Sequence, residues 1–80
     1  MPIPRTDLNR IAAKHGCNVV YRANGAAHIE GEEPQLRQVW GSLWRQHRLA
    51  PRFVVSSKVD GVEQAGFPRI EVHPQVVSLG

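Results

Sequence analysis

NVVYRANGAAHIEGEEPQLRQVWGSLWRQHRL, residues 18–49, is the stretch that decides the fold of this chain. It begins with two short β-rich runs, 18–23 and 26–31, which are joined by Asn24-Gly25. Asn-Gly favours a two-residue type I′ turn, because both central positions of that turn need a positive φ. The sequence therefore predicts a tight hairpin that turns at these two residues.

A two-residue turn also determines which hairpin residues face each other, and so which side chains share a face of the sheet. The predicted partners are Ala23 with Ala26, Arg22 with Ala27, Tyr21 with His28, Val20 with Ile29, and Val19 with Glu30. On this register the side chains expected on the core face are Val20, Ala27 and Ile29. The other face is expected to be mixed and partly exposed, and it holds Val19, Tyr21, His28 and Glu30.

An amphipathic helix is predicted over residues 34–48, directly after the hairpin. Pro34 suits the first helical position, and the carboxylates of Glu30, Glu32 and Glu33 suit the positive end of a helix dipole. The stripe expected to face the core consists of Leu36, Val39, Trp40, Leu43 and His47. The residues at the edge of this stripe and on its flank are Trp44, Arg37, Arg45 and Arg48.

The flanking residues add another helix and further strands. A first helix is predicted over 6–15, with Thr6 as its N-cap and Gly16 ending it, after an irregular lead-in over 1–5. The expected later segments are strands 52–58, 62–65 and 69–73, a hairpin turn at Asp60-Gly61, and a tail over 74–80. The prediction is one α+β domain, residues 1–80, of order αββαβ with one or two further strands. Two helices would pack on one face of a mainly antiparallel sheet.

The composition excludes several classes of protein. Hydrophobic residues at 41% and charged residues at 21% indicate a folded chain rather than a disordered one. Cys17 is the only cysteine, so no intramolecular disulfide can form. The histidines and this cysteine have no metal-binding spacing, so no metal or cofactor is expected. No Walker A, G-x-G-x-x-G or G-x-S-x-G motif occurs, and the chain is therefore expected not to be an enzyme.

Part of the chain resembles the STN domain, the small N-terminal module of secretins and of TonB-dependent transducers. That family runs L-x-x-[IL]-A-x-x-x-G-x-N-[VI]-V-[YV], then a strand ending near a glycine, a helix P-x-x-x-[AV]-L-x-x-L-L, and G-L-x-[YF]. The residues that match the first part are Leu8, Ile11, Ala12, Gly16, Asn18, Val19, Val20 and Tyr21. The looser matches to the later parts are Gly31, Pro34, Leu36, Val39, Leu43, Leu49 and residues 52–54.

The resemblance covers about residues 6–57, with a last strand at 69–73. It implies a non-enzymatic docking module that binds partner proteins through sheet edges and helix faces. The chain departs from the family in three ways: no strand is predicted before the first helix, Trp40 and Trp44 replace small or aliphatic residues, and no signal sequence is visible. No apolar run reaches the roughly 18 residues of a membrane span. The chain as written is therefore expected to be cytoplasmic, or periplasmic if it is a piece of a larger exported protein.

The candidate binding residues lie on the second helix and on the mixed face of the hairpin. Trp44 beside arginines has the composition of an interface hot spot, although the ring could instead cover the rim of a small core. Tyr21 and His28 could likewise be a pair that only stabilises the sheet. The predicted partner-binding residues are Trp44, Arg37, Arg48, Arg45, Tyr21 and His28. The expected partner is another protein, either a secretion-system component or a host complex that a small phage- or plasmid-type inhibitor would bind.

Two alternative functions stay open. The net charge is +3, with ten Lys and Arg against seven Asp and Glu, and a small basic regulator could bind single-stranded nucleic acid by phosphate contact and stacking. The residues that would serve it are Arg22, Arg37, Arg45, Arg48, Arg52, Tyr21 and Trp44. The glutamates before the second helix oppose a uniform positive field. The weaker alternative is a toxin-type RNase with His28 as its base.

Overall fold

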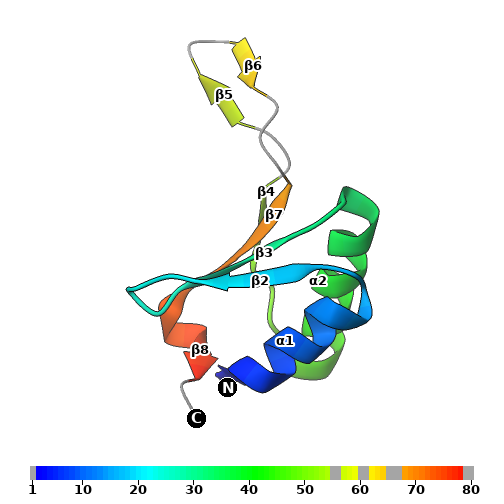
Figure 1. The fold of residues 1–80 in the computed structure, drawn as a ribbon, viewed down its shortest axis with the longest axis vertical. Coiled ribbons are helices and arrows are strands. Elements are labelled where there is room, and N and C mark those ends of the chain that lie inside the picture. The colour runs from blue at the N-terminus through cyan, green and yellow to red at the C-terminus, as the bar shows by residue number, and fades with distance from the viewer. Residues whose placement is uncertain (1, 55–56, 60–61, 65–67, 79–80) are drawn as a thin grey trace.

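The computed structural model describes residues 2–54, 57–59, 62–64 and 68–78. In chain order its elements are β1 (Ile3–Pro4), α1 (Arg5–Lys14), β2 (Asn18–Tyr21), β3 (Ala27–Glu30), α2 (Glu33–His47), β4 (Arg52–Val54), β5 (Ser57–Val59), β6 (Val62–Gln64), β7 (Arg69–Val72), the 3-10 turn η1 (Pro74–Val76) and β8 (Val77–Ser78). Within these residues, two helices and a mainly antiparallel four-stranded sheet form the body (Figure 1). The predicted α+β fold class is confirmed.

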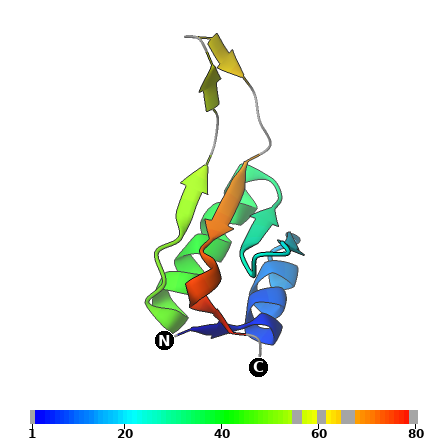
Figure 2. The same cartoon turned by 90° about the vertical axis from the view of Figure 1, so that its left-hand side faces the viewer.

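The body has one layer of helices on one layer of sheet. The sheet has the strand order β2-β3-β7-β4, every neighbouring pair is antiparallel, and α1 and α2 lie on one face (Figure 1). β1 and β8 form a short parallel pair near the two chain ends. β5 and β6 pair with each other and stand apart from the body, beyond the ends of β4 and β7 (Figure 2).

The core lies between the helices and the sheet. Across the sheet, one row of inward side chains joins Val19, Ile29, Ile70 and Phe53. The helices cover this row with buried apolar side chains, namely Leu8, Ile11 and Ala12 of α1 and Leu36, Val39 and Leu43 of α2. Leu36, Val39 and Leu43 were predicted to face the core, and that prediction is confirmed because the apolar period of α2 matches its buried face. Trp40 and His47, predicted in the same stripe, are only partly buried.

The predicted hairpin register is wrong by one residue. Val19 pairs with Ile29, Val20 with His28, and Tyr21 with Ala27. The turn is a three-residue loop: the Arg22 amide donates to the Ala26 carbonyl at 2.8 Å, and the Gly25 amide donates to the Arg22 carbonyl at 3.0 Å. Gly25 has a φ of 88°, whereas Asn24 is not among the residues with positive φ. A type I turn followed by a left-handed glycine is the usual three-residue hairpin loop.

Compared with the predicted register, the observed register exchanges the β2 side chains that face the helices with those that face outward. Val19 and Tyr21 pack toward the helices, while Val20 lies on the outer face and is 40% exposed. The Asn24 side chain bonds within the loop, where its Oδ1 accepts from the Ala26 amide at 2.9 Å. This local bond favours the longer turn over a type I′ turn. Since side chains alternate along a strand, one extra loop residue exchanges the two faces.

The N-terminal lead-in is also different from the prediction. Ile3 pairs with Val77 in the β1–β8 ladder, and both side chains are buried. α1 begins at Arg5, with Pro4 at the N-cap position and no capping side chain, so the predicted Thr6 cap is wrong. A two-residue strand has no periodicity that a sequence pattern can detect. It forms because the tail returns to lie beside it.

The C-terminal strands follow the prediction in part. The run 52–58 is divided into β4, which ends at Val54, and β5, which begins at Ser57. The predicted turn at Asp60-Gly61 lies outside the described residues, although Val59 pairs with Val62 on either side of it. Ile70 and Val72 of β7 are buried, as their alternation predicted. β7 lies between β3 and β4, so the last long strand of the chain is in the interior of the sheet.

Gly31→Ala is expected to lower the free energy of unfolding by about 1–3 kcal/mol, because an added Cβ would overpack a buried site. That Cβ would lie 2.6 Å from the Sγ atom of buried Cys17. Adding Cys17→Ala should recover part of the loss, since it removes the sulfur. Gly41→Ala is the matched control. There the nearest atoms belong to the flexible end of Arg45, and helix propensity should raise stability by up to about 1 kcal/mol. Urea denaturation measures all four proteins, and equal effects at both glycines would contradict the packing around Gly31.

Candidate functional site

Four side chains form a continuous band along one side of α2 and its C-terminal end. Arg37, Trp40, Trp44 and Arg48 follow each other at helical spacing, and we call this set the aromatic–arginine stripe. The two indole rings are stacked with centroids 6.5 Å apart and planes inclined by 15°. The Arg48 guanidinium lies 5.6 Å from the centroid of the Trp44 ring. Trp44 is nevertheless 44% exposed, so the stripe presents a large apolar ring to solvent.

Packing and one hydrogen bond hold the stripe in place. Leu36, Val39 and Leu43 anchor α2 on the sheet, which leaves the neighbouring side of the helix facing outward. Trp40 is half-buried, and its Nε1 donates to the Pro51 carbonyl at 2.8 Å. This bond satisfies the polar atom of the indole. The Trp40 ring, which stacks on Trp44, is therefore held both by α2 and by the segment that follows α2.

Arg48 occupies an unusual backbone position at the end of α2. Its φ is 53°, and among the described residues it is the only non-glycine with positive φ. The Arg48 amide donates to the Trp44 carbonyl at 2.9 Å, and the Leu49 amide donates to the Leu43 carbonyl at 3.2 Å. The bond from Arg48 to Trp44 is that of the αL C-cap motif, which usually has glycine at the left-handed position. A side chain there costs on the order of 1 kcal/mol, and here it carries the guanidinium that covers Trp44.

The stripe continues onto the sheet edge through Phe53 of β4. The Arg37 guanidinium lies 5.8 Å from the centroid of the Phe53 ring and also donates to Glu33 Oε1 at 2.8 Å. Arg37, Trp40 and Phe53 line a hollow of about 300 Å³. Sequence reasoning did not include Phe53, because only the sheet topology brings β4 beside α2.

The other predicted binding residues do not join the stripe. Arg45 turns away, and its guanidinium lies 3.4 Å from Ser42 Oγ. Tyr21 packs toward α1, where its hydroxyl donates to Asn9 Oδ1 at 2.7 Å and lies 3.2 Å from the Arg5 carbonyl. Burial raises the pKa of Tyr21, an effect that the Arg5 guanidinium partly offsets.

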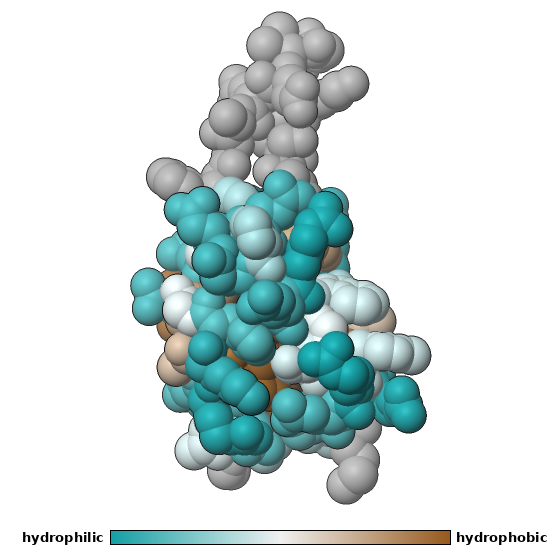
Figure 3. Space-filling model, turned by 90° about the vertical axis from the view of Figure 1, so that its right-hand side faces the viewer, coloured by the Kyte–Doolittle hydropathy of each residue, from teal (hydrophilic) through white to brown (hydrophobic). Residues whose placement is uncertain are grey.

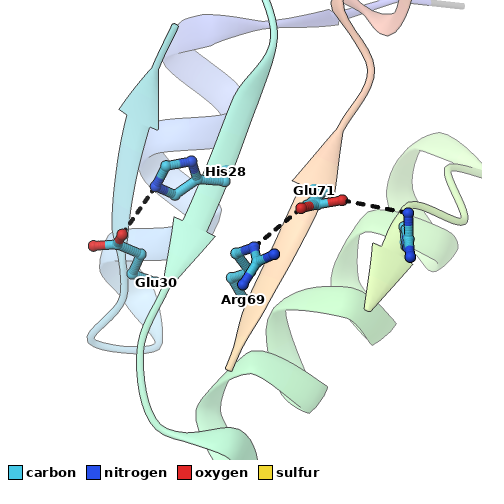
Figure 4. Close-up of polar contacts among 5 residues, drawn as sticks. His28, Glu30, Arg69 and Glu71 are labelled. Atoms are coloured by element: carbon cyan, nitrogen blue, oxygen red, sulfur yellow. Dashed lines mark hydrogen bonds and ion pairs between the residues drawn. The ribbon is translucent and has the colours of Figure 1, made fainter. Parts of the chain in front are cut away.

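The predicted Tyr21–His28 pair does not form, because the shifted register places these side chains on opposite faces of the sheet. His28 lies on the face away from the helices and is only 9% exposed. Its Nε2 donates to Glu30 Oε1 at 2.9 Å, and on the neighbouring strand Arg69 Nε donates to Glu71 Oε1 at 3.0 Å (Figure 4). His28 therefore does not form the exposed binding surface with Tyr21 that the sequence predicted.

A groove of about 490 Å³ lies at the end of the sheet. Its walls come from three segments that are distant in the sequence: residues 22 and 26–28 of the hairpin, residues 49–52 after α2, and residues 71–74 and 76 near the C-terminus. We call it the sheet-end groove. No sequence pattern pointed to it, because each segment contributes only a few side chains.

The remaining surface gives less specific information. The helix-bearing side is largely hydrophilic in Figure 3, which agrees with the polar outer residues of α1 and α2. Cys17 is buried, and burial raises the pKa of its thiol. In the described part of the chain no three His, Cys, Asp or Glu side chains are grouped as metal ligands. Neither described helix has the length and apolar character needed to cross a membrane.

Comparisons with known proteins found no relative, so a function has to be inferred from the site itself. No family model matches the chain, and no curated protein and no solved structure matches it either.

Proposed function

We propose that this chain is a non-enzymatic protein-binding module whose aromatic–arginine stripe contacts the partner. The observation that carries the proposal is the state of Trp44, which is 44% exposed although it is held between Trp40 and Arg48. A ring that only sealed the core would be covered by its neighbours. Trp and Arg are the residues most enriched among interface hot spots, and the stripe contains two of each.

The stripe is also preorganised for binding. Stacked aromatic rings lose little side-chain freedom on association, and such a pair contributes about 0.5–1.5 kcal/mol beyond its buried area. The left-handed backbone of Arg48 adds local strain, and strain of this kind is concentrated at functional sites. Glycine would relieve that strain, so the presence of arginine at this position supports a role for the guanidinium beyond folding.

The fold gives the proposal its second support. The STN pattern has a strand before its first helix, and β1 supplies a strand at that place. We propose an STN-like docking domain that binds a secretion-system component, or a small phage- or plasmid-type inhibitor that binds a host complex. In both forms the chain would act in the cytoplasm, or in the periplasm as part of a larger exported protein. The nucleic-acid alternative is less well supported, because Glu33 already pairs with Arg37 in the stripe.

Trp44→Ala is expected to abolish partner binding. The test is capture of proteins from an extract of the source cells on immobilised chain, followed by mass spectrometry. Val20→Ala is the matched control, because Val20 is the other exposed large hydrophobic among the described residues and lies on the opposite side of the sheet. A specific partner should be retained by the wild type and by the control and be lost with Trp44→Ala.

Arg48→Gly separates binding from stability. Glycine relieves the left-handed strain, so the free energy of unfolding should stay the same or rise by up to about 1 kcal/mol. Binding should fall, because the guanidinium over Trp44 is lost. A partner retained equally by Trp44→Ala and Arg48→Gly would refute the stripe as the contact surface. Single-stranded DNA and RNA form a separate arm: binding that falls steeply with salt would favour the nucleic-acid alternative.

A further inference from the structure

We propose that the sheet-end groove binds a small amphipathic anion, with an apolar body and a carboxylate head. This inference does not depend on the protein-binding role of the stripe. The groove encloses about 490 Å³, which is within the usual range of small-molecule sites. Such sites combine mainly apolar walls with a few polar groups that fix the orientation of the ligand.

The walls of the groove are mainly apolar. Side chains from the hairpin, from the segment after α2 and from the C-terminal segment line it, and the apolar ones include Ala26, Ala27, Leu49, Pro51, Val72 and Val76. Ala27 and Val72 are neighbours across β3 and β7, so the floor rests on the interior of the sheet. An alkyl or aryl group would displace water from this surface, which is favourable in proportion to the apolar area covered.

The charged groups at the groove favour an anion. Arg22 is exposed, and its side chain has no bond to any described residue. The Arg52 side chain is 79% exposed, and its guanidinium is 3.9 Å from Glu71 Oε2. The other oxygen of Glu71 already accepts from Arg69 Nε at 3.0 Å. Glu71 is the only acid among the described lining residues, so the two lining arginines leave an excess of positive charge for a ligand.

Two imidazoles lie in the wall of the groove, and His73 is the one that offers a donor to an anion. His28 lines it, and its Nδ1 is buried without a partner among the described residues. His73 also lines it, and its Nδ1 accepts from the Gln75 amide at 3.1 Å, which places the ring proton on Nε2. A carboxylate near Arg22 and Arg52 would accept from the Nε2–H of His73, whereas the Nδ1 of His28 is an acceptor because its Nε2 donates to Glu30. Guanidinium groups suit a carboxylate because two parallel N–H bonds match its two oxygens.

The test is a 1H–15N NMR titration with octanoate, using octanamide of the same chain length as the neutral comparison. Octanoate is expected to give saturable shifts at amides of residues 22–28, 49–52 and 71–76. Octanamide should bind about tenfold more weakly, since it lacks the charge that the arginines pair with. The double variant Arg22→Gln/Arg52→Gln should lose a similar factor, while Arg45→Gln, outside the groove, should bind as the wild type does.

Three results would overturn the inference. The first is the absence of saturable shifts at the groove. The second is equal affinity for octanoate and octanamide, which would mean that the negative charge of the ligand does not contribute to binding. The third is unchanged octanoate binding by the double variant. The spectra themselves report whether each variant is folded, so failure of a variant to fold is distinguishable from failure to bind.

Discussion

Val19→Asp is expected to destabilise the domain by about 3 kcal/mol, whereas Val20→Asp, one residue later, should cost less than about 1 kcal/mol. Val19 packs against the core and shares an inward row with Ile29. Val20 points to the outer face and is 40% exposed. A carboxylate at the first position must leave water, and at the second it stays solvated. For a chain of this length the total stability is about 4–12 kcal/mol, so the first loss would be a large share of it.

Urea denaturation of the two variants measures this difference directly. The pair is matched in residue type and in the substituted group, and the positions differ only in the face of β2 that they occupy. A two-residue turn at Asn24-Gly25 predicts the opposite order, with Val20→Asp the more damaging. Equal losses, or a larger loss at Val20, would therefore contradict the observed hairpin register.

Ile70→Ala is expected to cost about 3–4 kcal/mol, the second large effect. Ile70 is fully buried on β7, between Ile29 of β3 and Phe53 of β4. Removing three carbons from the middle of this row leaves a cavity that the surrounding strands cannot fill. Arg69→Ala is the control on the same strand, because Arg69 points to the outer face and makes an ion pair with Glu71 that contributes at most about 1 kcal/mol.

Thermal and urea unfolding should show a large drop for Ile70→Ala and little change for Arg69→Ala. The loss at Ile70 should be accompanied by weaker protection of β3, β7 and β4 amides from hydrogen exchange, since all three strands share the row. Comparable stability of the two variants would mean that β7 is not an interior strand.

The stripe on α2 was largely predictable. Helical spacing alone places Trp44 beside Trp40 and one turn before Arg48, and the hydrophobic period shows which side of α2 faces the core. Arg45 could not be separated from Arg48 in this way, because both lie on the outer flank. Their distinction depends on Arg48 ending the helix in the left-handed conformation while Arg45 reaches Ser42.

The hairpin shows why the rest of the site was not predictable. Asn-Gly marks a turn correctly, but its length is decided by a bond from the Ala26 amide to Asn24 Oδ1 and by packing of Val19 and Tyr21 under the helices. Because strand side chains alternate with a period of two, this single-residue difference exchanged the faces of β2. Tyr21 and His28 therefore lie on opposite faces instead of forming one binding surface.

The sequence by itself determined the fold class, the two helices with their buried apolar residues, and the place of Trp44 beside arginines on the second helix, whereas the exposure of the Trp44 ring was seen only in the structure. The predictable features depend on residues close together in the chain, which interact through local periodicity and helix-end chemistry. Only the tertiary structure decided the strand order, the β1–β8 pair, the place of Phe53 beside Arg37 and the sheet-end groove. Each of these joins segments far apart in the sequence, and their meeting depends on how the whole core packs.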